Sequence, residues 1–225
     1  MTTPAESDRI AVALSAGTVE ISAIAESPGE PWATVAIAHG AGAGMQHPFL
    51  VGFARGMRAH GVATVRFTFP YLEAGRRMPG PAAHAIATWS AVERFVLERS
   101  RAPLFAAGKS YGGRMASMAA AEGAIAPTGL VYLGYPLHPP GKPEKPRVAH
   151  LPAIAQPQLF VEGTNDPFVQ PLTQLREAIA ACREAQAHWV EGGGHSFEVA
   201  GRKLPADEVG EQLASPVVEW MRALG

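Results

Sequence analysis

A short glycine-flanked segment holds the residue best suited to nucleophilic chemistry. Gly108-Lys109-Ser110-Tyr111-Gly112 fits the pattern G-x-S-x-G. The apolar run Leu104–Ala107 leads into it, and the Ala- and Met-rich stretch Tyr111–Glu122 leaves it. A strand, a sharp turn and a helix in this order expose a serine hydroxyl at the strand end, and glycine fits the crowded positions beside the turn. The sequence therefore predicts Ser110 as a nucleophile; the alternative is an ordinary helix-capping serine.

A serine hydroxyl needs a base, and the base needs a group that orients it. Asp166 lies in the loop after the apolar run Gln158–Glu162, and His195 follows Gly192-Gly193-Gly194 after the next such run, His188–Glu191. The chain order serine, acid, histidine suits nucleophile, orienting acid and base on successive strand ends. We predict these roles for Ser110, Asp166 and His195. The alternative for Asp166 is a turn residue before Pro167.

The negative charge of a tetrahedral intermediate needs two backbone N–H donors. The residue after the nucleophile, Tyr111, supplies one in the expected geometry. The second is expected from the small-residue loop His39–Gly44, which follows the apolar run Thr34–Ala38. Ala41 is the first choice for this donor and Gly42 the second. The alternative is that the loop is simply a flexible glycine-rich connection.

Two competing motifs fail on their spacing. Gly108-Lys109-Ser110 resembles the end of a phosphate-binding loop, but the glycine required five positions earlier is Pro103. The segment Gly40–Met45 begins like a dinucleotide fingerprint, but Met45 stands where the third glycine is required. A nucleotide cofactor is therefore not expected.

Apolar runs that alternate with amphipathic stretches must position these residues. Predicted strands are Thr18–Ala25, Thr34–Ala38, Ala63–Phe67, Leu104–Ala107, Leu130–Leu133, Gln158–Glu162 and His188–Glu191. Predicted helices are Pro48–His60, Ala82–Glu98, Tyr111–Glu122, Leu172–Arg183 and Ala206–Leu224. This alternation predicts an α/β fold with a mostly parallel sheet and helices on both faces, in one domain over residues 1–225. The Pro-rich stretch His138–Pro152 reads as a surface connection, and whether it acts as a flap is open.

The composition excludes several classes of protein. The chain has 225 residues, of which 47% are hydrophobic and 17% charged, with a net charge of −1, so it is globular and has no charge bias toward nucleic acid. Cys182 is the only cysteine, which rules out an internal disulfide and a Cys-rich zinc site. No histidine pair has helical metal-ligand spacing, so no metal is expected. The absence of a secretory signal and of a long apolar run predicts a cytoplasmic protein with no membrane partner.

Several segments together resemble a known family. They are His39-Gly40-Ala41-Gly42, His47-Pro48-Phe49, Gly108–Arg114, Gly134–Pro143, Gly163–Phe168 and Gly194–Phe197. This set, which spans nearly the whole chain, resembles small bacterial α/β-hydrolases loosely called dienelactone-hydrolase-like. That group also includes the hydrolase-like domain of a non-specific-lethal chromatin-complex subunit and a testis-expressed relative. The resemblance implies the α/β-hydrolase fold; dienelactone hydrolases proper use a cysteine nucleophile, whereas this chain has Ser110.

These observations predict a serine hydrolase that acts on a small ester-like substrate through an acyl-enzyme, without a cofactor. The chain is too short for a separate cap domain, so the site should be open. Candidate pocket residues are His47, Tyr71, Arg76, Arg77, Tyr135 and His138. The two adjacent arginines could bind a substrate carboxylate, or they could be a solvated basic pair.

Two alternatives are open: a non-catalytic interaction module that keeps the fold, and acyl transfer to peroxide or an alcohol instead of water. The oligomeric state is not predicted.

Overall fold

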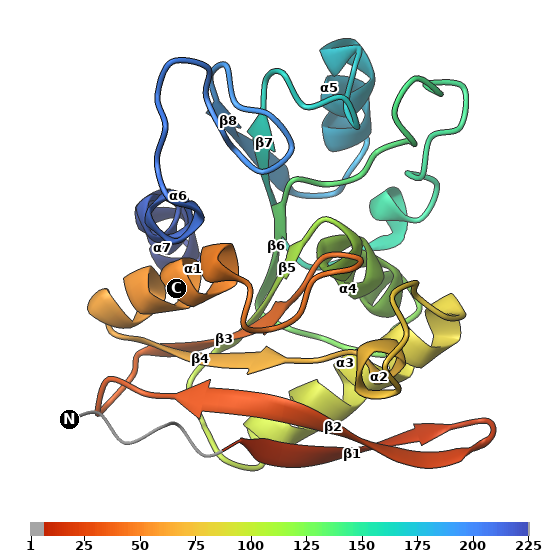
Figure 1. Ribbon diagram of the computed structural model, residues 1–225, viewed down its shortest axis with the longest axis vertical. Coiled ribbons are helices and arrows are strands. Elements are labelled where there is room, and N and C mark those ends of the chain that lie inside the picture. Colours follow the sequence, from red (N-terminus) through yellow and green to blue (C-terminus); the bar gives the residue numbers. More distant parts are fainter. Residues whose placement is uncertain (1–6, 225) are drawn as a thin grey trace.

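An eight-stranded sheet forms the centre of the computed structural model, which describes residues 7–224. The strands are β1 (Asp8–Leu14), β2 (Gly17–Glu26), β3 (Ala33–Ala38), β4 (Val62–Phe67), β5 (Leu104–Lys109), β6 (Gly129–Leu133), β7 (Gln158–Gly163) and β8 (Ala185–Val190). Their order across the sheet is β1-β2-β4-β3-β5-β6-β7-β8. β2 runs antiparallel to both β1 and β4, and all other neighbours are parallel (Figure 1). The predicted mostly parallel sheet is confirmed.

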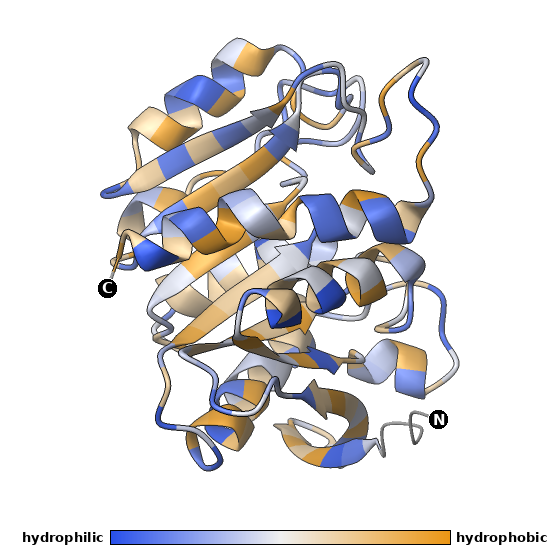
Figure 2. Ribbon diagram, turned by 90° about the vertical axis from the view of Figure 1, so that its left-hand side faces the viewer, coloured by the Kyte–Doolittle hydropathy of each residue, from blue (hydrophilic) through white to orange (hydrophobic). Residues whose placement is uncertain are grey.

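Helices cover both faces of this sheet. They are α1 (Pro48–Ala59), α2 (Pro70–Glu73), α3 (Ala82–Leu97), α4 (Tyr111–Ala121), α5 (Leu172–Ala180), α6 (Ala206–Gln212) and α7 (Ala214–Arg222), with a 3-10 turn η1 (Leu151–Ala153). α1, α6 and α7 lie on one face, and α3 and α4 lie on the other (Figure 1). Figure 2 shows hydrophobic strands at the centre and many hydrophilic residues on the surrounding helices. The predicted two-sided arrangement is therefore confirmed.

Each face of the sheet has its own hydrophobic core because side chains alternate along a strand. In β3, which is buried throughout, Val35 and Ile37 pack against the α1 and α7 side. Ala36 and Ala38 pack against the α3 and α4 side. Continuous apolar runs such as this one are typical of parallel strands covered on both faces.

The path of the chain at β3 creates the crevice in which the site lies. From β3 the chain crosses to β4 on one side, and it later returns to β5 on the other side of β3. The loops that leave β3 and β5 therefore turn in opposite directions at the carboxyl edge of the sheet. Ligand sites of open parallel sheets form at such a switch point.

Three segments differ from their predicted form. The last predicted helix is two helices, α6 and α7, because Pro216 has no amide hydrogen to bond the Gln212 carbonyl, and the chain breaks at Leu213. The sequence analysis missed the edge strand β1. The stretch 138–152 is not only a surface connection, because His138 and Leu151 are fully buried.

No helix among residues 7–224 combines the length and the apolar character that crossing a bilayer requires.

Candidate active site

The turn between β5 and α4 forces Ser110 into an unusual backbone conformation. Ser110 has φ 49° and ψ −111°, a region that residues with a side chain rarely adopt. Its amide donates to the Leu133 carbonyl at 3.0 Å, which ties the turn to the end of β6. A Cβ at Gly108 would overlap the Gly113 amide nitrogen, and one at Gly112 would lie 2.7 Å from the His39 carbonyl oxygen. Glycine at positions 108 and 112 thus permits the close approach that the turn needs.

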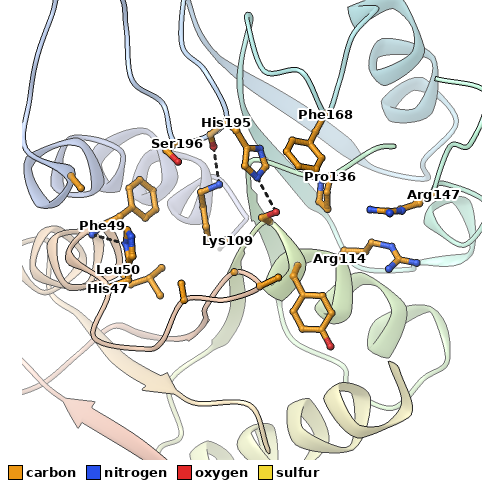
Figure 3. Close-up of a pocket in the computed structure, with 16 residues that line it drawn as sticks. His47, Phe49, Leu50, Lys109, Arg114, Pro136, Arg147, Phe168, His195 and Ser196 are labelled. Carbon is orange, nitrogen blue, oxygen red and sulfur yellow. Dashed lines mark hydrogen bonds between the residues drawn. The ribbon is translucent and has the colours of Figure 1, made fainter. Parts of the chain in front are cut away.

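A hydrogen-bond chain links three residues that are far apart in the sequence. His195 Nε2 lies 2.9 Å from Ser110 Oγ, and His195 Nδ1 lies 2.6 Å from Asp166 Oδ2. Asp166 is fully buried, and its other oxygen accepts from the Phe168 amide at 2.7 Å. The Phe168 ring lies against the imidazole with centroids 4.2 Å apart. The structure brings together the three residues that the sequence analysis singled out, and Figure 3 shows the bond between His195 and the serine hydroxyl.

Lys109 connects the nucleophile turn to the histidine loop. Its ammonium donates to the His195 carbonyl oxygen at 2.8 Å (Figure 3). Burial lowers the pKa of Lys109 to about 8, although the carboxylates of Glu162, Asp166 and Glu198 oppose this shift. The sequence analysis did not assign a role to Lys109, because it occupies a variable position of the G-x-S-x-G pattern. Its contact with the His195 loop depends on the fold, and the local sequence does not indicate it.

A second buried carboxyl lies close to Asp166. Glu162 belongs to β7, is fully buried, and accepts a hydrogen bond from the Tyr135 amide. Burial raises the pKa of Glu162 well above its ordinary value. The hydrogen bond from the Tyr135 amide and the charge of Lys109 lower this pKa, but by less. Burial thus opposes the charged form of Glu162, and Lys109 offsets only part of this effect.

The loop after β3 lies beside Ser110. Gly40 and Ala41 line the cavity that contains Ser110, and so does Tyr111. The Gly42 amide instead donates to the Tyr71 hydroxyl at 3.3 Å. Within residues 7–224 the amides of Ala41 and Tyr111 have no acceptor. This arrangement favours Ala41 over Gly42 as the donor that accompanies Tyr111.

The neutral imidazole of His39 fixes the start of this loop through its hydrogen bonds. The Phe69 amide donates to His39 Nε2 at 3.0 Å, so the proton of the neutral ring is on Nδ1, which lies 2.8 Å from the Gly40 carbonyl oxygen. The side chain is fully buried, and burial lowers its pKa from 6.5 to about 4. A protonated ring would lose the bond from Phe69, because Nε2 could no longer accept.

We expect acid to destabilise the protein through His39. Between pH 6.5 and pH 4 the unfolded chain binds a proton on this residue that the folded chain does not, so the free energy of unfolding falls as the pH is lowered. From pH 7 to pH 4.5 this contribution amounts to about 2–3 kcal/mol. Urea denaturation at the two pH values measures it.

The variant His39→Gln isolates this contribution. Its amide oxygen can accept from Phe69 but does not titrate, so the difference in unfolding free energy between pH 7 and pH 4.5 should be smaller than in the wild type. His150, whose pKa burial also lowers to about 4, contributes with the same sign in both proteins. An equal pH dependence in the two proteins would contradict the assignment to His39.

Ser110 and His195 open into a cavity of about 400 Å³, within the range of small-ligand sites. One side holds the apolar Phe49 and Leu50, with His47 beside them (Figure 3). The other side holds Arg114 and Arg147 (Figure 3). The sequence analysis missed both arginines, because their approach depends on how the 138–152 segment folds back over α4.

The structure distributes the predicted pocket residues over several places. His47 lines the cavity, and its Nδ1 accepts from the Phe49 amide. Tyr71 and Arg76 line a neighbouring hollow instead, and Arg77 lines neither. Tyr135 and His138 are fully buried and do not line the cavity. For these five residues the predicted place in the pocket differs from the structure.

The fold and the site define the class of α/β-hydrolases without a separate cap. The sheet, the strand–turn–helix serine and the loop of free amides are arranged as that class requires. The comparison with family models agrees: residues 31–222 match the family described as alpha/beta hydrolase domain, and the chain belongs to this family.

Solved structures share this fold at low sequence identity. An α/β serine hydrolase homologue from Coxiella burnetii has a TM-score of 0.72 at 20% identity, over 96% of this chain and 99% of that one. The dienelactone hydrolase from Anabaena variabilis has 0.71 at 19% identity, over 94% and 95%. An α/β serine hydrolase without lid from Xanthomonas campestris has 0.71 at 20% identity, over 98% and 97%. The predicted α/β-hydrolase fold is therefore confirmed.

Proposed function

We propose that this protein is a serine hydrolase that cleaves carboxylic esters or thioesters of small molecules. The observation that supports it is the hydrogen-bond chain from Asp166 through His195 to Ser110. This chain lies in the wall of a cavity large enough for a small substrate. Beside it, the free amides of Ala41 and Tyr111 provide donors for an oxyanion.

In the first half of the proposed reaction, Ser110 becomes acylated. His195 Nε2 accepts the hydroxyl proton as Ser110 Oγ forms a bond to the carbonyl carbon. The carbonyl oxygen takes the negative charge and faces the Ala41 and Tyr111 amides. When the carbonyl re-forms, the bond to the alcohol or thiol breaks, and the imidazolium gives its proton to the leaving group.

In the second half, water releases the acyl group. His195 takes a proton from a water molecule that attacks the acyl carbon, and it returns this proton to Ser110 Oγ as the ester bond breaks. The products are the carboxylic acid and the free enzyme. Throughout, Asp166 holds the proton of the neutral ring on Nδ1 and stabilises the imidazolium when it forms.

A fluorophosphonate probe tests the proposed nucleophile. The wild type should gain the mass of one phosphonyl group, and peptide mapping should locate it on Ser110. Ser110→Ala should not be labelled, because the reactive oxygen is gone. Ser196→Ala is the matched control: Ser196 lines the same cavity, but its hydroxyl has no bond to the imidazole, so labelling should persist.

Two outcomes would contradict the proposal. Full labelling of Ser110→Ala would place the reactive group elsewhere. A folded wild type that neither reacts with the probe nor turns over esters of any acyl length would favour the interaction-module alternative. Product analysis in the presence of a competing alcohol or peroxide separates hydrolysis from acyl transfer.

A further inference from the structure

Two arginines reach the cavity from different parts of the chain. Arg114 belongs to the first turns of α4, four positions after Ser110, and Arg147 belongs to the connection between β6 and β7. Both line the cavity that holds the serine hydroxyl, and Figure 3 shows them on the Pro136 side. Both arginines therefore lie in the wall of the space that a substrate of this site would occupy, and both also line a separate hollow.

Neither guanidinium has an anionic partner within residues 7–224. No ion pair involves Arg114 or Arg147, and Arg114 Nε is buried without any hydrogen-bond partner. The buried Arg66 also has an Nε without a partner, but its terminal nitrogens bond the Glu26 carboxylate and the Met45 carbonyl, whereas Arg114 has no such ion pair. Glu122 lines that separate hollow together with both arginines, but it forms no ion pair with either of them. A buried donor that lacks an acceptor is costly, and a bound anion would remove this cost.

The two arginines form no ion pair with their neighbours, and the nearest histidine adds no charge at neutral pH. Burial lowers the pKa of Arg147, and the nearby Arg114 guanidinium lowers it further. The adjacent His150 is a neutral ring at neutral pH, because burial and Arg114 lower its pKa to about 4, and its Nε2 lies 2.7 Å from Ser117 Oγ. The two cations thus repel one another, and an anion bound beside them would offset this repulsion.

The backbone holds Arg147 in place before any ligand binds. Its amide donates to the Leu137 carbonyl at 2.7 Å, and its carbonyl accepts from the Tyr135 hydroxyl at 2.9 Å. Leu137 and Tyr135 are both fully buried, so they anchor this part of the connection to the core. A preorganised arginine loses less entropy on binding than one on a free loop.

The residues in the remaining wall of the cavity would orient a bound substrate. Phe49 and Leu50 lie on the opposite side, with His47 beside them (Figure 3), and Ser110 and Ala206 also line the cavity. An ester bond at Ser110 would therefore have an apolar group on one side and the two arginines on the other. The planar guanidinium fork matches the two oxygens of a carboxylate.

We propose that Arg114 and Arg147 form a binding site for a carboxylate group of the substrate, so that the preferred substrates are esters with a free carboxylate on one side of the scissile bond. This inference rests on the proposed hydrolase function and adds the substrate class.

Matched substrate pairs test it. In one pair the carboxylate is on the acyl side: the 4-nitrophenyl monoester of glutaric acid against 4-nitrophenyl valerate. In the other it is on the alcohol side: 4-acetoxybenzoate against 4-acetoxybenzamide. In at least one pair, kcat/KM for the carboxylate substrate should exceed that for the neutral one by about 10- to 100-fold, as expected for a charge-assisted hydrogen bond. Added salt should raise KM for the carboxylate substrate only.

Arginine variants connect this preference to the site. Arg114→Met and Arg147→Met should each bring the ratio of kcat/KM values within a pair toward one. Arg76→Met is the matched control, because Arg76 lines the neighbouring hollow, and it should keep the wild-type ratio. If Arg114→Met does not fold, Arg147→Met tests the same site from a connecting segment.

The outcomes separate the two proposals. Turnover of neutral and carboxylate esters at equal efficiency in both pairs, or an unchanged ratio in the folded arginine variants, would overturn the carboxylate site and leave the hydrolase proposal intact. No turnover of any of the four esters, together with no probe labelling, would overturn both.

Discussion

Asparagine at position 166 should lower kcat for ester hydrolysis by about 10⁴-fold while the protein stays folded. The Asp166 carboxylate accepts from His195 Nδ1 at 2.6 Å, which leaves Nε2 free to accept the Ser110 proton. An amide can present its N–H₂ group to Nδ1 instead, and the ring proton then moves to Nε2, where it blocks the base. The amide also cannot stabilise the imidazolium. Initial rates with a chromogenic ester, together with circular dichroism, measure this effect.

Glu162→Gln is the matched control for this substitution. It makes the same carboxyl-to-amide change in another buried residue, which belongs to β7. Glu162 accepts from the Tyr135 amide and does not contact the imidazole. Because burial disfavours a negative charge at this position, a neutral amide should replace Glu162 with little change in kcat. Equal losses in both variants would mean that Asp166 acts through structure alone.

Alanine at Gly52 should reduce the free energy of unfolding by about 3 kcal/mol or more. In an exposed helix interior this substitution is stabilising by about 0.5–1 kcal/mol, because alanine is the better helix former. At Gly52, however, α1 crosses α6 so closely that a Cβ would overlap the Asp207 carbonyl oxygen. Gly210 faces the Phe49 carbonyl in the same way from the other helix. Backbone atoms cannot rotate away as side chains do, so the two helices must separate, which costs packing along their whole contact.

Gly44→Ala provides the reference for that measurement. A Cβ at Gly44 would meet no atom within 4 Å, so this variant should unfold at nearly the wild-type urea concentration. If Gly52→Ala were equally stable, the contact between α1 and α6 would have to be looser than the structure has it.

The sequence was most informative where a residue's environment is fixed by its own strand. β3 and β5 are buried on both faces, so their apolar runs identify them, and Ser110 follows directly from the glycines beside it. Asp166 and His195 could be placed because each follows a recognisable strand in the expected order. The catalytic roles of these residues, the cytoplasmic location, the single domain over residues 1–225 and the relation to the chromatin-complex subunit stay predictions.

Other features depend on contacts between distant segments, which local patterns do not report. Arg114 and Arg147 are 33 positions apart, and only the folded connection after β6 brings them to one cavity. The adjacent pair Arg76 and Arg77 was easier to notice in the sequence, yet it lies outside that cavity. The break between α6 and α7 had a local signal in Pro216, which the regular apolar spacing of the segment concealed.

The bond from Lys109 to the His195 carbonyl has a consequence for the timing of the proposed cycle. The contact between Ser110 Oγ and the imidazole is lost once the serine carries an acyl group, because the oxygen has no proton to share. The lysine bond uses the main chain of the histidine loop, so acylation does not break it. The base is thus retained at its working distance during the interval in which water must be activated, and the two halves of the reaction can use one imidazole in one position.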